Sequence, residues 1–485
     1  DVMTFLISGW DIKGAGALGI WNLGNGRNDS YPYLDWQYPD DPANPAVTNP
    51  YAPVVSTQVV TQITGNGATF NGTIISVGNP ASSQHGFCWN TTGSPSIADS
   101  LYEAGAVATA GAYTAQINTL IPNTTYYVRA YATNTVNTVY GEVFTFNTLP
   151  LVSVAPSGTG IQADPYLIGS LENLYWVAKQ SQSGNQFANK YFKQSSDIDA
   201  GITSTWVDGT GWQPIGNSSA SFQGTYDGDG HTITGLYINR PNASYQGLFR
   251  FCMYDTIKNL TVSNVNISGL SNVGGLIGSI QTAIVDNCQS SGTIVSSNTD
   301  SGGLIGNSVN VNLSNSHSSA GVNGSNNVGG LVGFTSGGTM TLTNCSSNGN
   351  VTGSGYIGGL IGRVYGASVN DCFSSSTVTG NSYVGGLVGR FGQLGYPATI
   401  TGCYSTGAVN GTIGNVGGLV GYAQDSSSIS NSYSSSPVSG NASVGGLVGY
   451  FTGSSSITNS YSRGSVTGST NVGGLVGYNS TSTVT

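Results

Sequence analysis

The feature that most constrains this chain is a pentad, Gly-Gly-Leu-Val/Ile-Gly, that recurs through its second half. The copies begin at Gly274, Gly302, Gly329, Gly358, Gly385, Gly417, Gly445 and Gly473, and a degenerate copy begins at Gln246. Their spacing of about 28 residues lies within the range of solenoid repeats. Each repeat holds two further strand-like pieces, and none has the apolar period of a helix. The repeats therefore predict a β-solenoid from about residue 195 to residue 485.

Alignment of the repeats predicts which side chains face the core. One ladder is branched and apolar, as at Ile257 and Ile457, and a second ladder of small residues, such as Cys372, follows three positions later. A separation of three breaks the alternation of a strand, so a corner lies between the two ladders. Asn tolerates left-handed backbone angles and stacks its amide along the axis, and it stands at this corner in Asn259, Asn287, Asn315, Asn344, Asn431 and Asn459. We predict an all-β chain dominated by a right-handed parallel β-helix, with the handedness taken from such folds in general.

The pentad also predicts an apolar surface. Strand alternation would point Leu447 and Val448 to opposite sides, so one ladder fills the core and the other faces outward. Either an aromatic side chain such as Tyr450 covers this aliphatic stripe, or the stripe is a contact surface for another chain or domain.

Two segments precede the repeats of residues 246–485. Residues 49–150 lose the period and predict an independent β-sandwich, in which the run from Leu120 to Tyr127 resembles the tyrosine-corner region of fibronectin type III domains. Residues 151–245 predict the start of the solenoid, with a helix capped by Ser170 that covers the first coil. The apolar face of this helix holds Leu171, Leu174, Tyr175 and Ala178. The aromatic residues beneath the helix are Trp206, Trp212 and Phe222.

Charge excludes some partners. Only 7% of the residues are charged, and 12 basic residues stand against 21 acidic ones for a net charge of -9. Without a basic patch the chain is not expected to bind nucleic acid, and without an apolar run of about 18 residues it is not expected to span a membrane. Low charge suits stacked coils, because like charges on neighbouring rungs repel.

The pentads closely resemble the GLUG motif of bacterial and archaeal surface proteins. The stretch from Phe222 to Ile233 is similar to the lead-in that such proteins carry before their repeats. The resemblance covers roughly residues 158–485. It implies a secreted or cell-surface protein, and it carries no established catalytic activity.

The first 48 residues resemble the terminal segment that normally follows a GLUG array, in Ser8–Ile12, Ile20–Leu23 and Ser30–Trp36. Since this segment precedes the array, and the array stops at Thr485 within a coil, we expect a permuted chain. Residues 1–48 would close the open coil of another copy by strand addition, and head-to-tail contacts of this kind produce a filament. The expected contacts are Trp10, Ile12, Trp21, Tyr31, Tyr33 and Trp36 on one copy and Leu475, Val476 and Tyr478 on the next. The alternative is that the chain is one period of a longer tandem protein.

Other functions stay open at this stage. A surface adhesin would bind glycans or a host surface through exposed Tyr and Trp side chains. A polysaccharide-cleaving enzyme would need convergent carboxylates, and the array offers almost none. We expect no enzymatic activity, no metal and no cofactor.

Several polar residues could have either a structural role or a chemical role such as metal binding. Cys288, Cys345, Cys372 and Cys403 predict buried packing residues rather than metal ligands. Vertical disulfides between Cys345, Cys372 and Cys403 are an alternative in a secreted protein. The run from Asp227 to Gly230 predicts a tight turn rather than a calcium loop. Sequons that could carry N-linked glycans lie at Asn71, Asn123, Asn242, Asn266, Asn350, Asn410 and Asn441.

Overall fold

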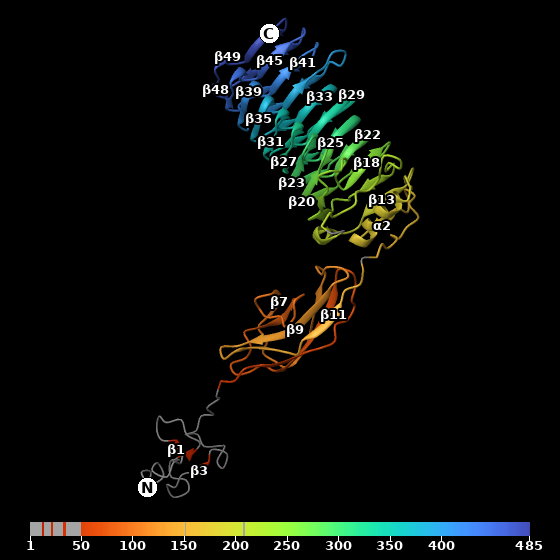
Figure 1. The fold of residues 1–485 in the computed structure, drawn as a ribbon, viewed down its shortest axis with the longest axis vertical. Coiled ribbons are helices and arrows are strands. Elements are labelled where there is room, and N and C mark those ends of the chain that lie inside the picture. Colours follow the sequence, from red (N-terminus) through yellow and green to blue (C-terminus); the bar gives the residue numbers. More distant parts are fainter. Residues whose placement is uncertain (1–11, 14–20, 23–32, 35–49, 151, 207–208) are drawn as a thin grey trace. The chain divides into compact units, whose positions relative to one another are not determined.

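The computed structural model describes residues 12–13, 21–22, 33–34, 50–150, 152–206 and 209–485. The chain divides into two compact units, Asp1–Leu149 and Pro150–Thr485, and is all-β, with 54% strand and 4% helix (Figure 1). A small sheet holds β1 (Ile12–Lys13), β2 (Trp21–Asn22) and β3 (Tyr33–Leu34). In it, β1 pairs with β2 in parallel and β2 pairs with β3 antiparallel.

Residues 50–149 form two antiparallel sheets around a shared core. One sheet is β4-β5-β8, and the other is β10-β9-β6-β7 with β11 also paired to β9. The strands are β4 (Val54–Thr57), β5 (Ala68–Ser76), β6 (Gln84–Asn90), β7 (Ser100–Gly105), β8 (Gly111–Ile117), β9 (Thr125–Thr133), β10 (Thr138–Tyr140) and β11 (Phe144–Asn147). Phe70 of β5 meets the rings of Phe87 and Trp89 of the other sheet edge to face.

This arrangement supports the predicted sandwich in part. The Tyr126 hydroxyl accepts a hydrogen bond from the Ile121 backbone N–H at 3.0 Å, five residues upstream, as in a tyrosine corner. Membership of the fibronectin type III family stays a prediction.

The predicted helix, α2 (Leu171–Gln182), follows the first strand of the second unit, β12 (Tyr166–Ile168). The Ser170 hydroxyl accepts from the Asn173 backbone N–H at 3.4 Å and caps the helix, as the sequence predicts. Leu171 and Leu174 are buried in the same core as Trp212 and Phe222, while Trp206 packs against that core and is partly buried. The helix therefore covers the first coil of the solenoid.

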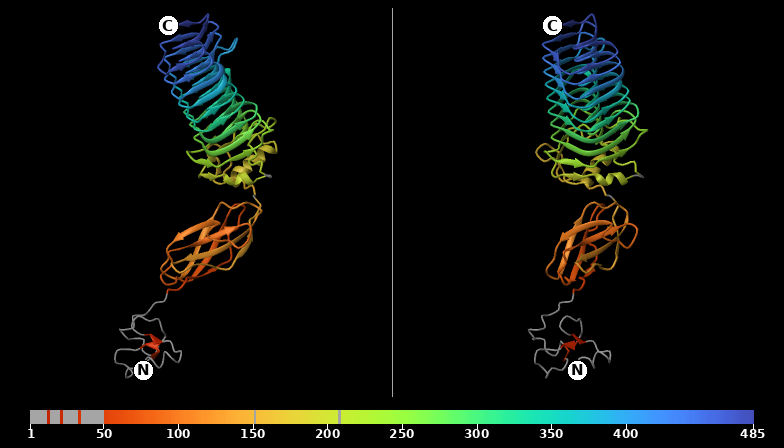
Figure 2. Two further views of the ribbon diagram at one scale, coloured as in Figure 1. Left: turned by 60° about the vertical axis from the view of Figure 1, so that its left-hand side comes forward. Right: turned by 90° about the vertical axis from the view of Figure 1, so that its left-hand side faces the viewer.

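The solenoid is a parallel β-solenoid of about 11 turns (Figures 1 and 2). Its first sheet, which carries the candidate site described below, has 17 strands. They are β12 (Tyr166–Ile168), β13 (Tyr191–Gln194), β15 (Thr225–Asp227), β18 (Phe249–Met253), β19 (Thr256–Lys258), β22 (Ile277–Asp286), β25 (Ile305–Ser314), β29 (Val332–Thr343), β33 (Ile361–Asn370), β36 (Val388–Phe391), β37 (Thr399–Thr401), β40 (Val420–Ala423), β41 (Ser428–Ser430), β45 (Val448–Thr452), β46 (Ser456–Thr458), β50 (Val476–Ser480) and β51 (Thr483–Val484).

The second sheet of the solenoid has 23 strands. They are β14 (Ile198–Asp199), β16 (Thr232–Thr234), β17 (Tyr237–Asn239), β20 (Thr261–Gly269), β21 (Val273–Gly274), β23 (Gln289–Ser296), β24 (Thr299–Gly302), β26 (His317–Ser318), β27 (Gly321–Asn323), β28 (Asn326–Gly329), β30 (Ser346–Ser347), β31 (Val351–Thr352), β32 (Gly355–Gly358), β34 (Phe373–Ser374), β35 (Val378–Gly385), β38 (Tyr404–Ser405), β39 (Val409–Gly417), β42 (Tyr433–Ser434), β43 (Val438–Ser439), β44 (Ala442–Gly445), β47 (Tyr461–Ser462), β48 (Val466–Thr467) and β49 (Thr470–Gly473).

The predicted Asn corners are confirmed. All six predicted Asn residues have positive φ, between 46° at Asn459 and 55° at Asn344. Their amides join consecutive coils, since Asn287 Nδ2 donates to Asn259 Oδ1 at 2.9 Å and Asn344 Nδ2 donates to Asn315 at 2.8 Å. These bonds run along the axis, as stacked amides do.

The predicted outward ladder of the pentad is wrong. Leu447 and Val448 are both fully buried, because the chain turns from the second sheet into the first at Gly445 and Gly446, and both following side chains point inward. A Cβ added at Gly446 would collide with the carbonyl oxygen of Gly474 in the next coil. The two glycines therefore permit a corner too tight for any side chain, and the apolar stripe belongs to the core.

Candidate functional site

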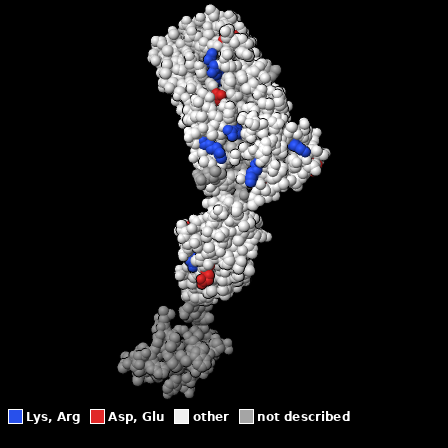
Figure 3. Space-filling view, turned by 45° about the vertical axis from the view of Figure 1, so that its right-hand side comes forward, with Lys and Arg blue, Asp and Glu red and all other residues white. Residues whose placement is uncertain are grey.

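The outward face of the first sheet carries one column of side chains that changes character along the solenoid. We call it the outer column, and strand register places its members on consecutive coils. It runs through Phe251, Ser279, Asn307, Phe334, Arg363, Arg390, Tyr422, Tyr450 and Tyr478. The column is therefore aromatic or cationic from Phe334 onward. The face of the molecule shown in Figure 3 is mostly uncharged, with Lys and Arg in isolated groups.

Two arginines of the outer column lie on neighbouring rungs, where Arg363 pairs in register with Arg390. The guanidinium carbon of Arg363 lies 4.3 Å from the ring centroid of Tyr365 and 4.9 Å from that of Tyr356. That of Arg390 lies 5.4 Å from the Tyr356 ring and 5.8 Å from the Tyr422 ring. The rings hold both cations in place by cation–π contact.

No acidic side chain lies within ion-pair distance of either arginine among the described residues. The buried Nε atoms of Arg363 and Arg390 also have no hydrogen-bond partner there. Burial, followed by the charge of Arg390, lowers the pKa of Arg363. Two like charges therefore sit side by side without a counter-charge in contact.

Asp300 is the acidic residue that acts electrostatically on Arg363. Its carboxylate accepts from Asn327 Nδ2 at 2.6 Å and from Asn307 Nδ2 at 3.1 Å. Burial raises the pKa of Asp300. Because two amides already engage its oxygens, Asp300 offsets the charge of Arg363 without an ion pair.

Two coils, one on each side of the coil that carries β33, depart from the regular repeat beside these arginines. In β29, residues 337–339 stand opposite Gly366 alone, so the strand bulges there. In the coil after β33, Gly385 and Gly417 are 32 residues apart, whereas other pentads follow one another by 27 to 29. Most of the extra residues form a turn closed by hydrogen bonds between Gln393 and Tyr396.

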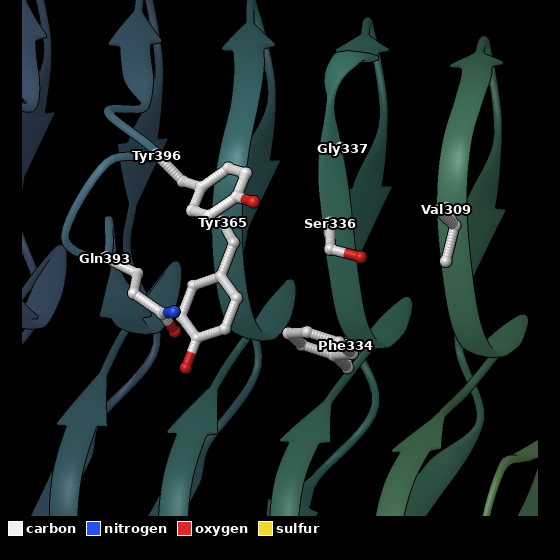
Figure 4. Close-up of a pocket in the computed structure, with 7 residues that line it drawn as sticks. All are labelled: Val309, Phe334, Ser336, Gly337, Tyr365, Gln393 and Tyr396. Carbon is white, nitrogen blue, oxygen red and sulfur yellow. The ribbon is translucent and has the colours of Figure 1, made fainter.

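The bulge and the extra turn border a groove of about 360 Å³ (Figure 4). It is lined by Val309 of β25, Phe334, Ser336 and Gly337 of β29, Tyr365 of β33, and Gln393 and Tyr396 of the extra turn. Phe334 and Tyr365 meet edge to face, with centroids 5.2 Å apart. The groove thus combines aromatic rings with a hydroxyl, an amide and an adjacent guanidinium, and its lining has no carboxylate.

A second aromatic arrangement lies on the other sheet. Phe373, Tyr404, Tyr433 and Tyr461 stack with centroids 5.0 to 5.1 Å apart and planes within 4° of parallel. Such a stack fills its ring faces with its own members, so it is a stabilising ladder rather than a binding platform.

The predicted assembly residues fall into two groups. Trp10, Tyr31 and Trp36 lie outside the described residues, while Ile12, Trp21 and Tyr33 lie in β1, β2 and β3. Leu475 and Val476 pack against the solenoid core and are partly buried. Tyr478 stacks on Tyr450 at 4.7 Å. The two groups belong to different units, so the predicted contact between copies stays a prediction.

The sequons differ in exposure. The exposed ones are Asn123, Asn242, Asn266, Asn350, Asn410 and Asn441. Asn71 is half-buried, and its Nδ2 donates to the Val59 carbonyl at 2.7 Å and to Thr61 Oγ1 at 3.1 Å. A glycan on Asn71 would break these bonds, whereas the other six amides are accessible.

The remaining candidate residues have structural surroundings. The six cysteines are buried free thiols, and burial raises the pKa of Cys288 to about 12, which keeps it protonated. Asp229 and Gly230 adopt positive φ in the predicted tight turn, and Asp227 contacts Lys258 at 3.2 Å. Among the described residues, no three His, Cys, Asp or Glu side chains gather as metal ligands.

Sequence reasoning missed the groove. Two sequence features indicate the groove. The interval from Gly385 to Gly417 is the longest between pentads, and Gly337-Gly338 lies within a strand-like piece. Residues inserted into single repeats commonly map to one face of a solenoid, and often to its binding face.

Comparisons with known proteins agree with the repeats. The family described as the GLUG motif matches residues 269–295, 353–379, 380–410, 413–438 and 440–467. Halomucin from Haloquadratum walsbyi is 35% identical over 144 residues, which cover 28% of this chain and 2% of halomucin. A protein of Evansella cellulosilytica described as a Gly-rich membrane protein is 32% identical over 140 residues, or 28% of this chain and 15% of that protein. The chain therefore matches only a small part of either relative.

A solved structure was also found, the sensor domain of the anti-sigma factor RsgI4 from Pseudobacteroides cellulosolvens. It is 18% identical, covers 21% of this chain and 97% of that chain, and has a TM-score of 0.16. Within the described ranges, no helix combines the length and hydropathy needed to cross a membrane. The chain contains GLUG motif repeats that fold as a parallel β-solenoid.

Proposed function

We propose that the chain is a surface-associated structural protein in which the solenoid serves as a stiff, non-enzymatic spacer. The observation that carries this proposal is the in-register main-chain pairing between successive coils, which runs from β12 to β51 in the first sheet. Each coil is hydrogen-bonded to the coil before and the coil after it, so bending must disturb many bonds together. The low charge limits repulsion between neighbouring coils, and the inward-facing ladders of apolar side chains pack the coils together.

A surface location is supported by resemblance. The resemblance of the pentads to the GLUG motif implies a surface protein, and one relative is described as a membrane protein. Antibodies raised against residues 50–149 should label intact cells of the source organism, and mild protease treatment of those cells should remove the label. Labelling that appears only after lysis would contradict a surface location.

The filament predicted from the sequence is the finer form of this proposal. Ile12, Trp21 and Tyr33 lie in extended strands, which is the backbone form that strand addition requires. Deleting residues 1–48 should abolish fibres seen by electron microscopy, while the intact chain forms them at the same concentration. Fibres of unchanged length after the deletion would end the filament proposal and leave the spacer role standing.

A further inference from the structure

The groove beside Arg363 has a chemical character that the spacer role does not require. We propose that it binds an acidic saccharide, with the sugar rings against Tyr365 and Tyr396 and the anionic groups of the sugar near Arg363 and Arg390. This inference is independent of the spacer function, since a solenoid that binds nothing would still serve as a spacer.

Charge is the first argument. Like charges directly opposite each other on neighbouring strands destabilise a sheet, yet Arg363 and Arg390 occupy paired positions. The outer column is uncharged at its other rungs, so repetition does not explain the pair. An anion bound between the two guanidinium groups would remove this repulsion.

The lining of the groove is the second argument. Tyr396 is 52% exposed, and Figure 4 shows its ring beside that of Tyr365, with Phe334 and Ser336 on the adjacent strand. The Tyr365 hydroxyl is buried and has no hydrogen-bond partner among the described residues. Rings with hydroxyl and amide groups at their edges suit a ligand that has both C–H faces and hydroxyl groups, as a sugar does.

The construction of the groove is the third argument. A bulge in β29 and an extra turn after β36 meet at this one place. Bulges re-aim side chains next to binding sites, and a volume of 360 Å³ falls within the roughly 300–1,000 Å³ of small-ligand pockets. The sugar could carry a carboxylate or a sulfate, and the two share the same chemistry toward arginine.

The test is calorimetric titration of the full chain with three hexasaccharides at low ionic strength. They are hexagalacturonate, its fully methyl-esterified form, and a sulfated carrageenan hexamer. At least one acidic hexamer should bind, and hexagalacturonate, if it binds, should bind at least about tenfold more tightly than its ester. Binding of the sulfated hexamer alone would identify sulfate as the recognised group. Absence of binding by both acidic hexamers at millimolar concentration, or equal binding of acid and ester, would overturn the proposal.

Matched variants locate the site. Tyr396→Ala should weaken binding about tenfold, while Tyr396→Phe, which keeps the ring, and Leu394→Ala in the same turn should bind within about threefold of wild type. Arg390→Gln should weaken binding of the acidic hexamer that binds. Arg463→Gln is the control, because its guanidinium lies over the Tyr461 ring at 4.9 Å, away from the groove. Equal losses in Arg390→Gln and Arg463→Gln would mean non-specific attraction and would also overturn the proposal.

Discussion

The backbone N–H of Cys372 donates to the Sγ of Cys403 in the next coil at 3.3 Å. The same bond recurs with serine on other rungs, where Cys288 N donates to Ser316 Oγ at 3.1 Å and Cys403 N donates to Ser432 Oγ at 3.1 Å. On these rungs a small side chain therefore supplies an acceptor atom to the backbone of the preceding coil.

Cys403→Ser should leave the free energy of unfolding within about 1 kcal/mol of wild type, because the hydroxyl replaces the thiol as acceptor. Cys403→Ala should cost about 1–3 kcal/mol, since the buried Cys372 N–H then loses its partner. Urea titration of both variants measures the difference. Equal stability of the alanine and serine variants would show that the acceptor is dispensable.

Gly446→Ala should destabilise the solenoid by more than about 2 kcal/mol, because the new methyl group meets the Gly474 carbonyl and forces the two coils apart. Gly338→Ala is the matched control, since nothing lies within 4 Å of a Cβ added there. Hydrogen exchange of the peptides around each site checks the result. Protection near Gly446 that survives the substitution would contradict the tight corner.

Asp255 should make the solenoid less stable as the pH rises from about 4 to about 7. Its side chain is 6% exposed, and burial raises its pKa from 3.8 to about 7. Between these values the folded state keeps the proton and the unfolded state releases it, so the contribution of Asp255 to stability is greatest below pH 4 and declines toward pH 7 by on the order of 4 kcal/mol.

Asp255→Asn should remove this decline, which is measured as the pH dependence of the unfolding midpoint. Asp99→Asn in the sandwich is the control. A backbone hydrogen bond from Ser96 lowers the pKa of Asp99, so its contribution changes only below about pH 4. An unchanged profile in Asp255→Asn would show that another group titrates in this window.

Tyr433→Ala should reduce stability by about 1–3 kcal/mol, because it removes ring contacts with both Tyr404 and Tyr461. Tyr433→Phe should have little effect, since Phe373 already occupies an equivalent rung. Near-ultraviolet circular dichroism and thermal unfolding report both outcomes. A loss as large in the phenylalanine variant would place the effect in the hydroxyl group.

Much of the fold can be predicted from the sequence because each coil repeats the same pattern of core and corner residues. The Asn corners and the inward ladders could be read from aligned copies, and the helix from its Ser170 cap. The orientation of Leu447 and Val448 could not, because strand alternation fails at a corner and only the collision at Gly446 reveals that corner. Arg363 and Tyr396 were missed because alignment emphasises what the repeats share, whereas the groove arises where two coils differ from the others.

The pairing of each coil with only its two neighbours has a consequence for how such proteins change over time. A whole coil can be gained or lost by duplication or deletion of one 28-residue unit without creating a new kind of contact. The length of the solenoid can therefore change during evolution while its cross-section stays the same.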